Sequence, residues 1–212
     1  MPLPLEVLLK EYISISISLF AIMDPLAAIP TLISYVGGNT GLGGRDLDTL
    51  VKQAVNRASA AIAILLTVFS LAGEFVLRAF NISIESLKVA GGLLLIVLAI
   101  KMLTAKEKEE VEKGDFAVVP IATPLIVGPG TMSTLIVYSR VYGPLTTLLG
   151  AYIALGLTYI TLRYSYVMFR YFGTSVLQGL GKFMSIIVAS IAVELAISGL
   201  RDLGVLAPVL AP

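Results

Sequence analysis

The residues best suited to chemistry stand in a short charged stretch inside a long apolar run. Met23-Asp24-Pro25-Leu26-Ala27-Ala28-Ile29-Pro30 combines a carboxylate with two prolines. A carboxylate near the middle of a bilayer costs about 2.5 to 3.5 kcal/mol on insertion scales, and a proline inside a helix costs about 3 kcal/mol. Such costs are offset where the chain lines a cavity that holds water or a ligand. The stretch therefore predicts the interrupted middle of a transmembrane helix.

A second stretch of the same kind follows about a hundred residues later, as Thr123-Pro124-Leu125-Ile126-Val127-Gly128-Pro129-Gly130. Asp or Thr followed by Pro is typical of a helix start, because the side-chain oxygen accepts a free N–H and proline has none to leave unpaired. We therefore expect Asp24-Pro25 and Thr123-Pro124 each to begin a half-helix whose exposed amides attract a carboxylate. Pro30 and Pro129 are predicted hinges that disturb or end these half-helices.

Together the two stretches predict a binding site for a small zwitterion. Its carboxylate would bind the half-helix amides, and its ammonium would face Asp24 or opened backbone carbonyls. The small side chains would favour glycine and alanine. Asp24 could carry a coupling proton or ligate sodium, and Glu194, inside another apolar run, is a second candidate for coupling. The predicted substrate-binding residues are Asp24, Pro25, Ala27, Ala28, Thr123, Pro124, Gly128, Gly130 and Thr131.

Composition limits the classes of function. Hydrophobic residues make up 57% of the 212 residues and charged residues 14%, which is typical of a membrane protein with room for about six helical spans. A net charge of +1 gives no basic footprint for nucleic acid. Because the chain has no Cys and no His, we expect no metal site, no cofactor and no enzyme.

The predicted fold is all-α, with six spans and polar connections between them. The polar segment from Gly37 to Arg57 is predicted to be a loop with a short amphipathic piece. Glu74 and Arg78 stand four residues apart and predict an ion pair on one helix face. Gly91-Gly92 predicts a close contact between helices. The expected spans cover about Leu5–Tyr35, Ser59–Ala79, Leu87–Leu103, Phe116–Tyr138, Leu145–Met168 and Phe183–Leu200.

The two proline stretches are the strongest part of an internal repeat. They superpose at an offset of 99 residues, and each repeat would hold three spans, with spans 1 and 4 interrupted. Three is an odd number, so the second repeat would enter the membrane from the opposite side. One membrane domain is predicted, with repeats at 1–104 and 116–212 and a charged linker at 105–115.

Basic residues predict the orientation of the chain in the membrane. Ten Lys and Arg fall after spans one, three and five, and five fall on the other side. The positive-inside bias then puts both termini outside. The sequence does not determine the oligomeric state, and a homo-oligomer is compatible with it. The ten residues are Arg45, Lys52, Arg57, Lys101, Lys106, Lys108, Lys113, Arg163, Arg170 and Lys182.

Three stretches of the sequence resemble the MarC family of integral membrane proteins, also called the neutral amino acid transporter family. They are Met23 to Pro30, Thr123 to Gly130 and the run from Gly91-Gly92 to Ala99-Ile100-Lys101. The resemblance implies an inner-membrane protein with six spans. It also implies a link to glycine and alanine uptake, with which SnatA-like archaeal members are associated. Glu194 departs from the family pattern, in which an amide often stands.

Two readings of the function follow from the residues and the resemblance. The first is a secondary transporter of small neutral amino acids that works by alternating access and is coupled to a proton or sodium gradient. The second is a passive channel or facilitator for small polar solutes, built from the same paired half-helices. An intramembrane hydrolase has little support, because no nucleophile and base pair is evident. A purely structural or regulatory membrane protein is the remaining alternative.

Overall fold

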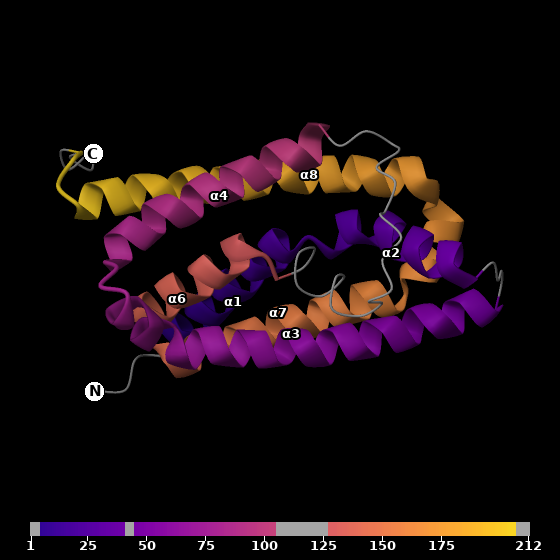
Figure 1. Cartoon of the computed structure of the whole chain (residues 1–212), viewed down its shortest axis with the longest axis horizontal. Helices are drawn as coiled ribbons and strands as arrows, with labels where there is room; N and C mark the ends of the chain where they lie inside the picture. Colours follow the sequence, from indigo (N-terminus) through magenta and orange to yellow (C-terminus); the bar gives the residue numbers. More distant parts are fainter. Residues whose placement is uncertain (1–4, 41–44, 105–126, 207–212) are drawn as a thin grey trace.

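A computed structural model describes residues 5–40, 45–104 and 127–206, and these residues are helical apart from short connections. Five segments are long and apolar enough to cross a membrane, and the first of them, Glu6–Gly37, contains Asp24. Residues 116–126 of the predicted fourth span lie outside the described residues, as does the predicted linker. The helices are α1 (Leu5–Met23), α2 (Pro25–Thr40), α3 (Arg45–Ala79), α4 (Ile84–Thr104), α6 (Pro129–Tyr142), α7 (Pro144–Arg163) and α8 (Ser165–Asp202), as labelled in Figure 1.

Two predicted connections are too long, because helices extend into them. The segment from Arg45 to Arg57 is the beginning of α3, which runs for 35 residues without a break. Val51, Val55 and Ala58 are buried at helical spacing, so this polar-looking segment has an apolar face to pack. Likewise α8 begins at Ser165, well before the predicted start, and bends at Gly173, whose φ of 72° lies outside the helical region.

The helices form two layers, which Figure 1 shows one above the other. Helices α4 and α8 lie side by side and share the most extensive contact in the molecule. A Cβ added at Gly92 would lie 2.6 Å from the carbonyl oxygen of Ala192, and one added at Gly91 would lie 2.6 Å from the Ser133 hydroxyl. The predicted close approach at Gly91-Gly92 is therefore confirmed, against α8 at one glycine and against α6 at the other.

The large contacts between helices join residues 5–104 to residues 127–206. Helix α4 packs on α8, α1 and α3 pack on α7, α2 packs on α8, and α6 packs on α3 and α4. Contacts within either part, such as α2 with α3 and α6 with α7, are smaller. The two parts of the chain are thus interleaved rather than laid next to each other.

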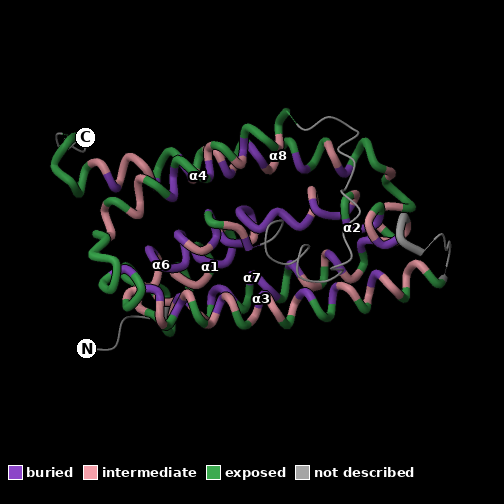
Figure 2. Tube along the Cα trace, in the orientation of Figure 1, coloured by how far each residue is buried: buried purple, intermediate pink, exposed green. Residues whose placement is uncertain are grey.

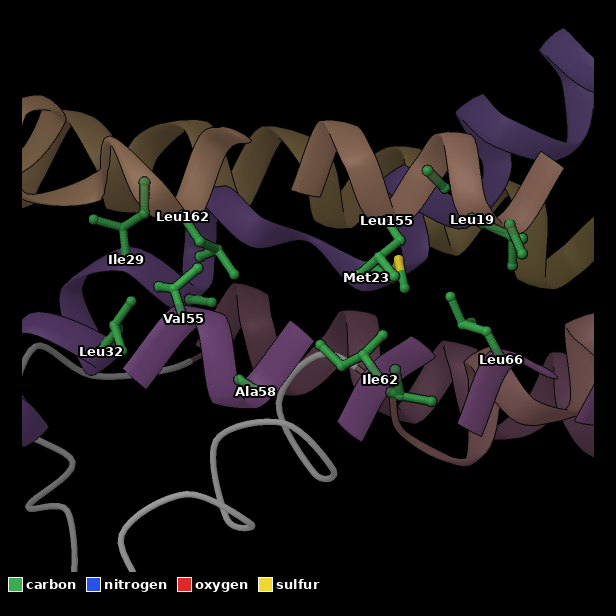
Figure 3. Close-up of a cluster of buried hydrophobic side chains, with 14 of the residues drawn as sticks. Leu19, Met23, Ile29, Leu32, Val55, Ala58, Ile62, Leu66, Leu155 and Leu162 are labelled. Atoms are coloured by element: carbon green, nitrogen blue, oxygen red, sulfur yellow. The ribbon is translucent and has the colours of Figure 1, made fainter. Parts of the chain in front are cut away.

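The main core lies in the lower layer. Figure 3 shows Leu19 and Met23 of α1 facing Leu155 of α7 and Ile62 and Leu66 of α3. The outer faces of α4 and α8 are mostly exposed, as the green segments of Figure 2 show, although many of their residues are large and apolar. Leu93 is 56% exposed and Ile186 is 57% exposed. Exposed apolar faces of this kind are what a helix in lipid presents.

Candidate functional site around Asp24

Asp24 separates α1 from α2 and is not itself helical. Its φ is 36°, in the left-handed region that non-glycine residues rarely adopt. Its backbone N–H donates to the carbonyls of Phe20, at 3.1 Å, and Ala21, at 3.2 Å, which ends α1 with a tightened turn. Pro25 then stands at the first position of α2, where its missing N–H costs nothing. The prediction that Asp24-Pro25 begins a helix is confirmed.

The carboxylate of Asp24 is buried, and only half of it is satisfied. The side chain belongs to a residue that is 5% exposed. One oxygen, Oδ1, accepts a hydrogen bond from the N–H of Ala27 at 3.3 Å, which is the geometry of a helix N-cap. The other oxygen, Oδ2, is buried without a hydrogen-bond partner among the described residues. A buried unsatisfied polar atom costs about 1–3 kcal/mol, and more when it carries charge, so Oδ2 is a place for a ligand or a proton.

Helices α7 and α8 close around this junction. Met23 is fully buried, and the Thr158 hydroxyl of α7 donates to its sulfur at 3.6 Å. Sulfur is a weak acceptor, so this buried hydroxyl is poorly satisfied. On the other side, Gly181 of α8 packs on Ala27, and a Cβ there would lie 2.8 Å from the Ala27 Cβ. Nothing in the sequence pattern singled out Thr158, which stands in an ordinary apolar run.

The start of α6 is the second part of the candidate site. Gly128 is its N-cap, with extended backbone and no side-chain hydrogen bond to the helix, and Pro129 is its first residue. A Cβ added at Gly130 would lie 2.4 Å from the end of the Leu95 side chain of α4, which would have to shift to make room for it. Thr131 is buried as well. A helix start of this kind presents backbone amides and the positive end of the helix dipole.

Asp24 and the start of α6 lie at about the same depth. The Ser18 side chain of α1 lies near the Tyr138 hydroxyl of α6, and the two helices run in opposite directions (Figure 1). Asp24 lies six residues beyond Ser18, or about 9 Å along α1, and Gly130 lies eight residues before Tyr138, or about 12 Å in the same direction. Ile22 and Leu95 also share one buried cluster, and Leu95 packs on Gly130.

The structure places the described site residues in two groups, at the α1–α2 junction and at the start of α6. Thr123 and Pro124 lie outside the described residues. Pro30 does not end α2, which continues through it to Thr40. Pro129 is the first residue of α6, where its ring suits a first turn that needs no N–H from it. The hinge roles of both prolines remain predictions.

Glu194 lies apart from Asp24, on the outward face of α8, where it is exposed. Its buried neighbours on the helix, Ala192 and Leu195, face the opposite way, toward α4 and α6. No ion pair of Glu194 occurs within the described ranges. Its predicted part in coupling would therefore have to act from the surface of the helix layer.

Comparison with known proteins identifies the family. The model of the MarC family of integral membrane proteins matches residues 9–203. The chain belongs to the MarC family. A UPF0056 membrane protein of Pyrococcus horikoshii is 31% identical over 208 residues, which cover 91% of this chain and 96% of the relative. One from Methanocaldococcus jannaschii is 29% identical, with 91% and 97% covered.

Similar proteins also occur in bacteria. The UPF0056 membrane protein YhcE of Escherichia coli is 27% identical over 206 residues, which cover 91% of this chain and 93% of the relative. No solved structure matches the chain. The family match covers both parts of the candidate site, at the α1–α2 junction and at the start of α6, and it makes the protein a multi-pass integral membrane protein.

Proposed function

We propose that this MarC family protein is a secondary transporter of small neutral amino acids such as glycine and alanine, coupled to a proton or sodium gradient. The proposal rests above all on Oδ2 of Asp24, an acidic oxygen buried without a partner in an apolar helix bundle. A structural capping residue needs only one oxygen, and Oδ1 already serves that purpose. The second oxygen is available for an ammonium group, a proton or a sodium ion.

The amides at the start of α6 supply the complementary half of the site. An amino acid zwitterion has a carboxylate and an ammonium on neighbouring atoms, so it needs an acceptor and a donor group close together. In this proposal Asp24 receives the ammonium, and the amides near Gly128 and Gly130 receive the carboxylate. Thr123 and Pro124 would extend that amide surface, as the sequence predicts.

We further propose that the six predicted spans form two inverted repeats with interrupted spans 1 and 4. Exchanging α2 with α6, α3 with α7 and α4 with α8 turns the main helix contacts of α2 into those of α6. Helix α2 contacts α8, α7 and α3, while α6 contacts α4, α3 and α7. This correspondence supports a pseudo-twofold arrangement with α1–α2 as one interrupted span. Sites at the meeting point of such repeats are typical of secondary transporters.

The tight packing at the site implies that transport requires movement. Ala27 is in contact with Gly181, and the Leu95 side chain occupies the space beside Gly130. In this conformation the small residues therefore have no open space next to these contacts. Both contacts are made with the layer of α4 and α8. Alternating access would occur when this layer moves relative to α1, α2 and α6, which opens the space next to Asp24.

Uptake into proteoliposomes tests the proposal. We expect the purified protein to take up labelled glycine and alanine when a proton or sodium gradient is imposed, and Asp24→Asn to abolish or uncouple this uptake. Asp202→Asn is the matched control, because that carboxylate is exposed and pairs with Lys88 at the end of α8. Uptake by Asp24→Asn at the rate of the unmodified protein would contradict the proposed site.

A passive channel or facilitator is the second candidate, and the same vesicles distinguish it. A carrier preloaded with unlabelled alanine accumulates labelled alanine by counterflow, whereas a channel only equilibrates it. Saturable counterflow would favour the transporter. Uptake that follows the substrate gradient alone, with no counterflow and no response to either ion, would favour the channel.

A further inference from the structure

The two ends of the helix bundle carry their charges differently. At the end where α3 finishes, Glu74 accepts hydrogen bonds from Arg78, at 2.7 Å, and from Arg140, at 3.2 Å. Lys88 pairs with Asp202 at 2.6 Å at the same end. Arg78, Arg140 and Lys88 are thus neutralised within the chain.

At the opposite end, four basic residues of the described ranges lack acidic partners. No carboxylate pairs with Arg57, Arg163, Arg170 or Lys182 in the described part of the chain, and the Asp48–Lys52 pair is internal to α3. Two of these four residues belong to the elbow, the name used here for residues 163–173, in which α7 ends and α8 begins. The excess of positive charge at this end is therefore open to an anion from outside the protein.

Arg163 is held in place without being neutralised. Its guanidinium lies 5.8 Å from the ring centre of Tyr159 and donates to Oδ1 of Asn56 at 3.4 Å. The Tyr159 hydroxyl donates to the same Asn56 oxygen at 2.9 Å, which fixes Asn56 between the two. A guanidinium has five N–H donors, so most of them remain free. Its planar arrangement of donors can bind two oxygens of one phosphate.

The elbow lies where the protein leaves the hydrocarbon region. Helix α7 has 20 residues, which is about 30 Å and matches the thickness of a bilayer core. Arg163 ends this helix, one core thickness from the Arg140 end. In Figure 1 the chain then crosses from the layer of α7 to the layer of α4 through the first part of α8, the helix that bends at Gly173. The first turns of α8 thus run across the end of the bundle.

The exposed side chains of the elbow suit a membrane interface. Tyr171 is 82% exposed, Tyr164 58% and Phe172 54%, and Arg170 is exposed among them. Aromatic residues of this kind are enriched at headgroup level, where one face meets acyl chains and the other meets water. Arg beside them meets lipid phosphate. We propose that the elbow, with Asn56 and Arg57 of α3, is a binding site for the headgroup of an anionic phospholipid.

Retention of phosphatidylglycerol by the full-length protein tests this site. The protein is reconstituted in vesicles of phosphatidylcholine and phosphatidylglycerol and extracted in mild detergent, and the bound lipid is measured by native mass spectrometry. Each basic residue near an anionic surface contributes about 1 kcal/mol, so we expect Arg163→Gln to lower the retained phosphatidylglycerol about fivefold. Arg163→Gln with Arg170→Gln should lower it about thirtyfold.

The controls separate a site from general charge. Arg78→Gln removes the same charge at the other end, where Glu74 neutralises it, and should leave retention unchanged. Arg163→Lys keeps the charge but loses the paired N–H donors of the guanidinium. Its lipid retention should lie between that of Arg163→Gln and that of the unmodified protein. Excess inorganic phosphate should not displace the lipid. The variants are compared only if they melt at the same temperature as the unmodified protein. The proposal would be overturned if Arg78→Gln and Arg163→Gln lost lipid equally, or if neither variant changed the retention. Displacement of the lipid by phosphate alone would overturn it too.

Discussion

Two carboxylates stand inside apolar helical segments of this protein, and the fold treats them in opposite ways. Asp24 is 5% exposed, sits where the backbone leaves the helix and has one oxygen without a partner. Glu194 lies in the long part of α8 after the bend at Gly173 and is exposed on its outer face. The same chemical group is therefore held inside the bundle in one place and presented outward in the other. The acid that the bundle holds inside is the one beside which a helix ends, between α1 and α2.

The largest effect is expected from Asp24. Asp24→Asn keeps the size and the capping oxygen but removes the negative charge, so gradient-driven alanine uptake should fall by at least about two orders of magnitude, or about 2.7 kcal/mol. Initial rates in proteoliposomes measure this. If Asp24→Asn retained its uptake, the comparison between the two acids would lose its basis.

A large effect on stability is expected at the glycine contact that joins the layers. Gly92→Ala places a Cβ 2.6 Å from the backbone oxygen of Ala192, which cannot move without shifting α8. Overpacking of this kind costs about 1–3 kcal/mol, so thermal unfolding in detergent should occur at a lower temperature. Gly156→Ala is the control, because nothing lies within 4 Å of its added Cβ. Equal melting temperatures for the two variants would mean that α4 and α8 are not held this closely.

Glu194→Gln tests whether the exposed acid of α8 takes part in transport. Because Glu194 is exposed and lies away from the α1–α2 junction, we expect gradient-driven uptake by this variant to stay within about twofold of the unmodified protein, or about 0.4 kcal/mol. Uptake is compared under proton and sodium gradients separately. Loss of the response to one ion, with counterflow intact, would instead make Glu194 the coupling residue that the sequence suggests.

The smallest effect on stability is expected at Thr158. Thr158→Val keeps the shape and removes a buried hydroxyl whose acceptor is only a sulfur atom, so the free energy of unfolding should change by less than about 1 kcal/mol. The same variant reports on the site, since Thr158 contacts the residue next to Asp24. A loss of stability well above this value would show that the hydroxyl has a stronger structural role than its geometry indicates.

Much of the arrangement was predictable because local chemistry decides it. Asp24-Pro25 begins a helix since a carboxylate can cap the amide of Ala27 and proline needs no N–H at that position. Glu74 and Arg78 form the predicted ion pair because four residues make about one helical turn. Gly91-Gly92 forms a close contact because glycine removes the side chain that would separate two helices. These predictions depend on neighbours in sequence and on the helical repeat alone.

The failures have a common cause, which is that tertiary contacts extended or redirected helices. The segment 45–57 looked polar, yet Val51 and Val55 are fully or almost fully buried, so α3 continues through it. Helix α8 likewise begins at Ser165, well before the predicted start at Phe183, and bends at Gly173.

The sequence by itself determined that this is a helical membrane protein of the MarC family with an acid at an interrupted helix, because hydrophobicity, helix capping and proline geometry are local properties. Only the tertiary structure decided which acid faces inward and that Thr158 and Gly181 close around Asp24. It also decided that the basic residues of the elbow form no ion pair with any described carboxylate. Those features depend on which faces of distant helices meet, and residues more than a hundred positions apart, such as Met23 and Thr158, carry no sign of that meeting in their own sequence neighbourhoods.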